Sequence, residues 1–139
     1  MVQQTLVFNA ELVSFEGVAR TIAIRDDLTL VDLHYALQSA FGWDDDHLYA
    51  FWLDGAFWST DCDHYLHPLH KQTGDVLCKS AYTPLSELGL DVGRRLAYVF
   101  DFSSEWRVAL TVQRAVEAGG EVPARVLGAV GQAPPQYAT

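Results

Sequence analysis

A short histidine-rich segment holds the densest group of potential metal ligands in this chain. Within ten residues it carries three histidines, two aspartates and a thiol, and the candidate ligands are Asp61, Asp63, His64, His67 and His70. Imidazole nitrogens and carboxylate oxygens bind Zn²⁺ and similar divalent ions. Pro68 interrupts any helix that would align the histidines, and no Cys-x-x-Cys pair occurs. A zinc or other divalent site is one hypothesis, and a solvated polar loop without a cofactor is the alternative.

A second candidate site combines His34, His47 and Asp101. His34 lies on the apolar edge of a predicted helix, and His47 opens a predicted strand after an acidic turn. If both histidines face one pocket with Asp101 and Trp106, they could perform general acid–base chemistry. The alternative is that both are hydrogen-bonded structural residues. No Ser or Cys stands in a nucleophile-elbow pattern, and no glycine-rich phosphate motif is present.

Four tryptophans are many for a chain of this length. Each buries a large apolar area and needs a partner for its N–H group, so we expect most of them in the core. The segment 47–53 is apolar on both faces, which predicts a central strand covered on both sides. A single helix can cover only one face of the sheet, so the other face would be left without a helix. Trp43, Trp52 and Trp106 are therefore candidate binding residues for an aromatic groove or a homodimer interface.

Size and charge narrow the function classes. The chain has 139 residues, half of them hydrophobic, which predicts one domain over residues 1–139. Nine basic against eighteen acidic residues give a net charge of −9, so we expect no direct contact with nucleic acid. We expect no leader peptide and no membrane span, and the two cysteines are too few for a disulfide framework. We expect a cytoplasmic protein with reduced thiols.

The elements that must position these residues follow from hydrophobic periodicity. Alternation predicts antiparallel strands over 5–15 and 18–25, and apolar residues at helical spacing predict a helix over 30–41. Thr29 and Asp32 form a capping-box pair at its start, and Gly42 stands at its end.

The second half of the chain is less regular. We expect a short return strand over 56–59, a loop over 60–80 with a short strand at 76–79, and a short helix at about 84–88. Residues 117–139, rich in Ala, Gly, Val and Pro, are predicted to form an irregular C-terminal arm. The fold class is then α+β: a mostly antiparallel sheet built from hairpins with one main helix packed on one face.

The stretch 96–112 predicts a hairpin, since large apolar residues alternate on both sides of a polar centre. A three-residue loop over 103–105 would pair Phe102 with Trp106 and keep the large apolar side chains on one face. It would also place Asp101 opposite Arg107 as a cross-strand ion pair. Glu105 would then adopt a left-handed conformation.

Several of these pieces together resemble the plasmid pRiA ORF-3-like family, whose members also occur as passengers of bacterial insertion sequences. The resemblance rests on Thr29-Leu30 leading to Leu33-His34, on Phe41-Gly42-Trp43, and on the stretch 47–51. The sequence Phe100-Asp101-Phe102 with Trp106 matches the hairpin of the family, although Ser103-Ser104 replaces its usual Gly-Asp. The resemblance implies an α+β domain and transfers no established activity.

We therefore expect a non-enzymatic binding or interaction module with an unknown protein or small-molecule partner. The first alternative is a metal-dependent or acid–base enzyme that uses the His and Asp residues named above. The second is an accessory protein of a mobile element, which rests only on the genetic setting of relatives.

Overall fold

The computed structural model describes residues 3–60, 63–67, 69 and 78–136. They form one eight-stranded sheet in the order β5-β4-β3-β6-β7-β1-β2-β8, together with the helix α1 (Leu30–Phe41). The strands are β1 (Gln4–Leu12), β2 (Ala19–Arg25), β3 (Tyr49–Trp52), β4 (His64–Leu66), β5 (Cys78–Ser80), β6 (Arg95–Phe100), β7 (Trp106–Glu117) and β8 (Ala124–Val130). Among these residues no helix has the length and apolar character needed to cross a bilayer.

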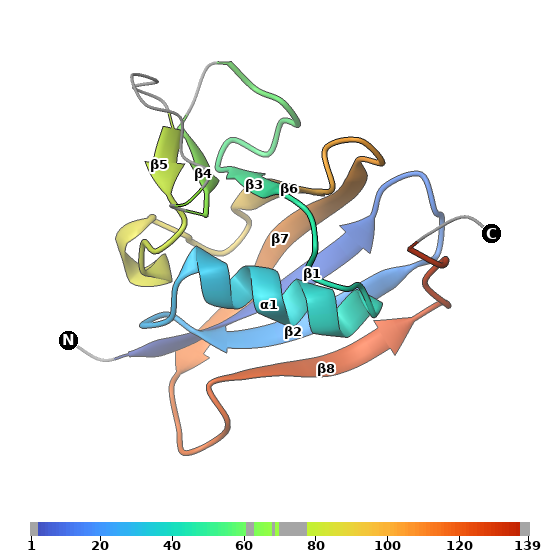
Figure 1. Cartoon of the computed structure of the whole chain (residues 1–139). Helices are drawn as coiled ribbons and strands as arrows, with labels where there is room; N and C mark the ends of the chain where they lie inside the picture. The colour runs from blue at the N-terminus through green and yellow to red at the C-terminus, as the bar shows by residue number, and fades with distance from the viewer. Residues whose placement is uncertain (1–2, 61–62, 68, 70–77, 137–139) are drawn as a thin grey trace.

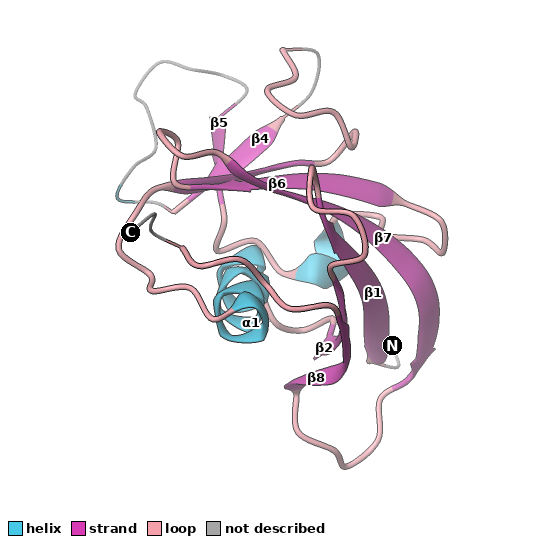
Figure 2. Cartoon of the chain, turned by 90° about the vertical axis from the view of Figure 1, so that its right-hand side faces the viewer, coloured by secondary structure: helices cyan, strands magenta, loops and turns pink. Residues whose placement is uncertain are grey.

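The sheet curls around α1. Seen from the side, β6 and β4 lie above the helix, β7 and β1 form the wall, and β2 and β8 close the lower edge (Figures 1 and 2). Neighbouring strands run antiparallel, as predicted, apart from β4 and β5, which are parallel. The main core fills the concave side between helix and sheet.

The helix has the predicted bounds because its local end signals are strong. The Thr29 hydroxyl accepts the Asp32 N–H, and the Asp32 carboxylate accepts the Thr29 N–H, which completes the capping box. Gly42 takes a left-handed conformation at the C-terminal end, with φ of 73°. Leu30, Leu33 and Leu37 are fully buried against the sheet.

Strand β3 is central and buried on both faces, as the sequence predicts. Tyr49 and Phe51 belong to the main core on the helix side. Ala50 and Trp52 belong to a second, smaller apolar cluster on the other side. Consecutive strand residues point to opposite faces, so this four-residue strand serves two separate surfaces.

The predicted register of the hairpin is wrong: each residue of β7 pairs with a β6 residue two positions earlier than predicted. Phe100, not Phe102, pairs with Trp106, and the connection spans residues 101–105. A shift of two keeps the same face inward, so the core prediction holds. Phe102 leaves the strand and packs on the opposite sheet face. The predicted Asp101–Arg107 pair is also wrong, because Arg107 lies opposite Val99 and bonds Glu105.

Two short elements differ from the prediction. Residues 56–59 form turns instead of a return strand, and β4 pairs with β3 in their place. The left-handed backbone of Trp58, with φ of 57°, breaks the extended conformation that a strand needs. The predicted helix at 84–88 is a single 3-10 turn, η2 (Leu85–Glu87). The predicted strand at 76–79 appears as β5, and residues 76 and 77 lie outside the described part.

The expectation of an irregular arm over 117–139 is wrong for Glu117 and for Ala124–Val130, which are strand residues. Strand β7 extends to Glu117, and β8 pairs with the outer edge of β2. Strand β8 is largely exposed on both faces, so it lacks the alternation that predicts strands. Its end is fixed by the buried Arg20, whose guanidinium donates to the carbonyls of Val130 and Gly131 and of Ala40 in α1.

Candidate functional site

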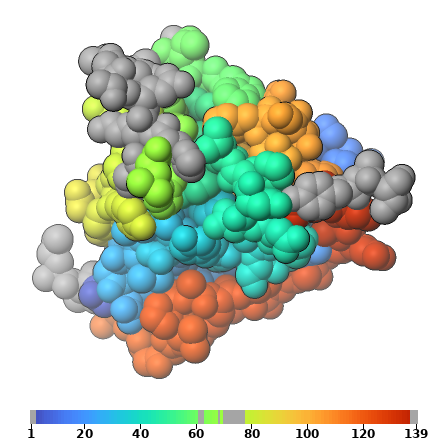
Figure 3. Space-filling view, in the orientation of Figure 1, coloured from blue at the N-terminus to red at the C-terminus, as the bar shows by residue number. Residues whose placement is uncertain are grey.

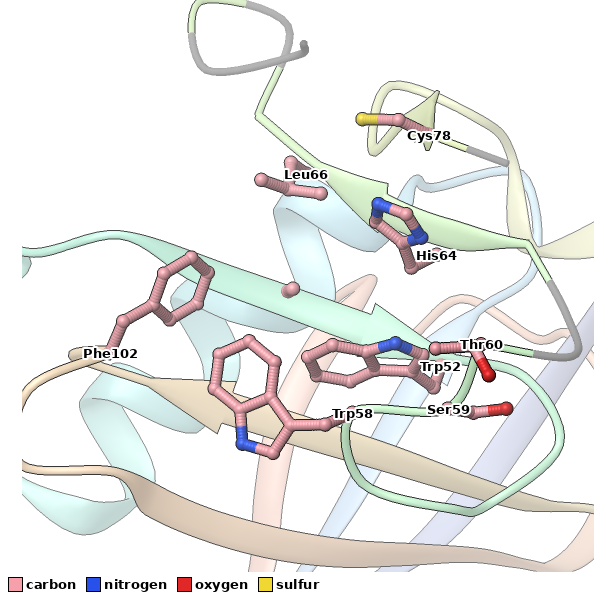
Figure 4. A pocket seen from close by; sticks show the side chains of 9 residues that line it. Trp52, Trp58, Ser59, Thr60, His64, Leu66, Cys78 and Phe102 are labelled. Atoms are coloured by element: carbon pink, nitrogen blue, oxygen red, sulfur yellow. The ribbon is translucent and has the colours of Figure 1, made fainter. Parts of the chain in front are cut away.

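Two concave surfaces lie on opposite faces of the sheet around β3 and β4. On the face away from α1 there is a groove of about 240 Å³. Figure 4 shows its side chains, with Phe102 near one end and Ser59, Thr60 and His64 near the other. We call this surface the aromatic groove. It is lined by Ala50, Trp52, Trp58, Ser59, Thr60, His64, Leu66, Cys78 and Phe102.

Three aromatic rings line the groove, and the ring of Trp58 is steeply inclined to the other two. The centroid of the Trp58 ring lies 4.9 Å from that of the Trp52 ring, with an interplanar angle of 61°. It lies 5.1 Å from the centroid of the Phe102 ring, with an interplanar angle of 71°. Ala50 has the smallest side chain among the lining residues and leaves room beside these rings. The groove therefore follows from one small residue among large aromatic ones on the sheet surface.

The wall that carries Trp58 is held by side-chain hydrogen bonds. The Trp58 indole N–H donates to Glu105 Oε1 at 2.8 Å, and Arg107 donates to the same oxygen at 2.6 Å. The hydrogen bond from Arg107, and to a smaller extent the one from Trp58, lowers the pKa of the Glu105 carboxyl below its usual range. At the other end the Ser59 hydroxyl donates to Asp54 Oδ2 at 2.6 Å. Trp58 and Glu105 are both left-handed, and such strained positions persist where surrounding contacts fix them.

On the helix side there is a second cavity of about 420 Å³, which we call the acidic cleft. Figure 3 shows the turn that follows α1 beside the helix on this side of the molecule. The cleft is lined by Tyr35, Asp45, Asp46, His47, Leu48, Tyr49, His67 and Leu69.

His34 lies next to the acidic cleft and is only 1% exposed. Its Nε2 is 2.8 Å from Asp45 Oδ1, and its Nδ1 is 2.7 Å from the Tyr98 hydroxyl. The Gln38 amide donates to the same hydroxyl at 3.0 Å. The His34 ring is stacked on the Tyr49 ring, with the two centroids 3.6 Å apart.

The proton positions in this network follow from the partners. A carboxylate only accepts, so the Nε2–H of His34 donates to Asp45, and Nδ1 of the neutral ring accepts the Tyr98 O–H. Burial lowers the pKa of His34, although the hydrogen bond and charge of Asp45 oppose that shift. Burial also raises the pKa of the Tyr98 hydroxyl well above its usual value. Both groups are therefore neutral near pH 7, and the arrangement positions Asp45.

The structure brings His47 and Asp101 together, as the second hypothesis requires. His47 Nε2 lies 3.6 Å from Asp101 Oδ2 and 3.3 Å from Asp46 Oδ1. Asp101 is buried and left-handed, and its Oδ1 accepts the backbone N–H groups of Ser103 and Ser104. His34 does not join this pair, because its own partner is Asp45.

The three tryptophans proposed for binding separate into two groups. Trp52 lines the aromatic groove. Trp43 is buried in the main core, where its ring stacks on Phe100 at 5.5 Å and lies 5.7 Å from that of Trp106. Trp106 also packs against Phe15, and it is not among the lining residues of either surface.

The fold places two of the histidines proposed as metal ligands, His64 and His67, on different surfaces. His64 lines the aromatic groove and His67 lines the acidic cleft, so the two imidazoles lie on opposite faces of the sheet. Asp61 and His70 lie outside the described residues. Within the described ranges no group of three or more His, Cys, Asp or Glu side chains is placed to hold a metal ion. Asp63 is described and belongs to no such group.

Sequence reasoning missed most residues of both surfaces. The sequence predicts Trp58 and Phe102 as core residues, and Asp45 belongs to an acidic turn to which the sequence assigns no role. Their roles depend on contacts across the fold: Trp58 meets Glu105 of the hairpin, and Asp45 meets His34 of the helix. A signal for Phe102 existed, since it is apolar and lies next to the serines of the hairpin loop.

A family model for the plasmid pRiA4b ORF-3-like protein matches residues 5–137. The chain belongs to this family. The uncharacterized protein y4hQ of Sinorhizobium fredii is 28% identical over 121 residues, which cover 86% of the present chain. The match covers 58% of y4hQ, so the chain spans little more than half the length of that relative.

A solved structure has the same fold. It is the crystal structure of a protein of unknown function, MM3350, from Methanosarcina mazei Go1, with a TM-score of 0.78 and 20% identity. The match covers 98% of the present chain and 74% of the other. The ORF-3-like family thus supplies a fold, and the function has to be argued from the two surfaces.

Proposed function

We propose that this ORF-3-like protein is a binding module that takes a small, uncharged aromatic molecule in the aromatic groove. The observation that carries the proposal is the set of three steeply inclined rings around Ala50. Ligand sites are mostly apolar and aromatic, with a few polar groups that fix orientation. The groove has this composition, since its hydroxyls and imidazole gather near one end (Figure 4).

The size and charge of the groove narrow the ligand class. A volume of about 240 Å³ is small for a ligand pocket and suits one ring or two fused rings. Among the residues that the structure describes, the lining includes no carboxylate, lysine or arginine. Burying a charged group there without a counter-ion would cost several kcal/mol, which favours an uncharged ligand. A hydroxyl on the ligand would meet Thr60 or His64.

The test is a titration followed by NMR of the ¹⁵N-labelled protein, which reports on the indole N–H groups of Trp52 and Trp58. 2-Naphthol should shift both indole signals saturably. Naphthalene-2-sulfonate, which has the same rings and a fixed negative charge, should not. Cyclohexanol should bind more weakly than 2-naphthol because it cannot stack on the rings.

Two variants and one control locate the binding. Ala50→Leu fills the groove and should abolish the shifts. Thr60→Val removes a hydroxyl at constant shape and should weaken 2-naphthol by several-fold. Ala109→Leu adds the same atoms to β7 outside the lining residues and should bind like the wild type. Unchanged affinity in Ala50→Leu, or equal binding of the sulfonate, would contradict the proposal.

A further inference from the structure

We propose that the acidic cleft is a second binding site, separate from the aromatic groove, for a primary amine attached to an aromatic body. Tyr49 and Ala50 are consecutive residues of β3 and line the cleft and the groove respectively. Because they face opposite sides of the sheet, the two sites are independent.

The anionic anchor of this site is Asp45. Its carboxylate side chain is 40% exposed, and one of its oxygens is held by the Nε2–H of buried His34 at 2.8 Å. A hydrogen bond from a rigid imidazole fixes the carboxylate without neutralising it, because His34 itself is uncharged near pH 7. Asp46 lines the same cleft, so the charge at its mouth is negative. A cation is the ligand that this field attracts.

Tyr49 supplies an independent sign of a missing partner. Its side chain lines the cleft and is 5% exposed, yet its hydroxyl has no hydrogen-bond partner among the residues that the structure describes. A buried polar group left unsatisfied costs about 1–3 kcal/mol, so such groups call for an explanation. Burial raises the pKa of this hydroxyl, which keeps it protonated and able both to donate and to accept.

The imidazole of His34 contacts both Asp45 and Tyr49. It stacks on the Tyr49 ring and bonds Asp45 at its edge. An ammonium group has three N–H donors, so a ligand nitrogen bound to the carboxylate has donors left for the Tyr49 hydroxyl, which is buried in the free protein and has to be uncovered when the ligand binds. Beyond that point the walls are the ring of Tyr35 and the side chains of Leu48 and Leu69, which suit an aromatic body.

The probe is benzylamine, compared with benzyl alcohol and benzoate, which keep the ring and change only the charge. Calorimetry and NMR at low salt should show benzylamine binding, with shifts at Tyr49 and Asp45. Benzyl alcohol should bind at least about tenfold more weakly, and benzoate should not bind. Added salt should weaken benzylamine because the attraction is electrostatic. Equal binding of alcohol and amine would overturn the proposal.

Two variants test the named groups. Tyr49→Phe should weaken benzylamine about tenfold, yet leave the free protein as stable as the wild type or more so, because it removes an unsatisfied buried hydroxyl. Asp45→Asn should abolish binding, whereas Asp44→Asn removes the same charge from the same turn outside the cleft and should have little effect. If Tyr49→Phe and Asp45→Asn both keep wild-type affinity, the site is not where we place it. Retained amine binding in Ala50→Leu is expected, and its loss would show that the sites are not separate.

Discussion

The buried Tyr98 hydroxyl is the junction of the network that joins α1, β6 and the turn after the helix. Tyr98 is fully buried, and its hydroxyl is shared by His34 Nδ1 at 2.7 Å and by the Gln38 amide at 3.0 Å. Tyr98→Phe removes this single oxygen and leaves the ring, which packs on Phe51 at 4.8 Å. The substitution therefore isolates the polar contribution from the packing contribution.

The expected cost can be built from the two lost contacts. Each hydrogen bond contributes about 0.5–1.5 kcal/mol net, and a buried group left without a partner costs about 1–3 kcal/mol. After the substitution His34 Nδ1 has lost its donor. Gln38 would lack a partner for Nε2, and its Oε1 already has none among the described residues. We expect Tyr98→Phe to lower the free energy of unfolding by about 2–4 kcal/mol.

Urea unfolding at pH 7.5, followed by tryptophan fluorescence, measures this loss as a lower midpoint with an unchanged m-value. Tyr82→Phe is the matched control, since its side chain is 57% exposed and should change stability by less than about 0.5 kcal/mol. If Tyr98→Phe costs no more than Tyr82→Phe, the hydroxyl does not hold the network together, and the positioning of Asp45 by His34 needs another explanation.

Three further predictions concern groups around the helix. Burial lowers the pKa of His34 in the folded state, so the stability that neutral His34 contributes is complete above the unfolded pKa of 6.5 and is lost as the pH falls toward the folded pKa. The free energy of unfolding, measured with urea from pH 8 to 5.5, should fall by at most about 1.4 kcal/mol per pH unit, and by less in His34→Gln. Arg20→Ala should cost about 2–4 kcal/mol because it removes the guanidinium hydrogen bonds to the carbonyls of Ala40, Val130 and Gly131. Arg20→Lys should recover little since a lysine lacks the planar fork, and full recovery would contradict this. Thr29→Ala should cost about 1 kcal/mol in thermal or urea unfolding, and no loss would mean that the capping box is dispensable.

Local signals explain why the helix was predictable to the residue. Thr29, Asp32 and Gly42 determine the ends of α1 through contacts within a few residues, and the structure has the same contacts. The inward face of the hairpin was also predictable, because alternation depends only on the parity of the register. The register itself was not predictable from the sequence, since it depends on the packing of Phe102 against Trp58 on the opposite face of the sheet.

Long-range pairing explains what the sequence did not reveal. Strand β8 forms because β2 offers an open edge and Arg20 binds the carbonyls at its end, and neither condition leaves a periodic pattern in the segment itself. The site residues follow the same rule. His34 was identified as a candidate, but its partner Asp45 is eleven residues away across the end of the helix, in a turn that resembled ordinary solvated loop.

The two proposed sites exist because β3 and β4 present side chains to both faces of the sheet. Along β3, Tyr49 faces the helix side and Ala50 the other side, and near β4 the pair His64 and His67 is divided in the same way. Alternation thus separates residues that are close in sequence, which weakens the metal hypothesis for the two described histidines. It also places a charged, hydrogen-bonded surface on one side and an apolar one on the other. A ligand for one site should therefore differ in charge from a ligand for the other, and each can be removed by a substitution that leaves the other intact.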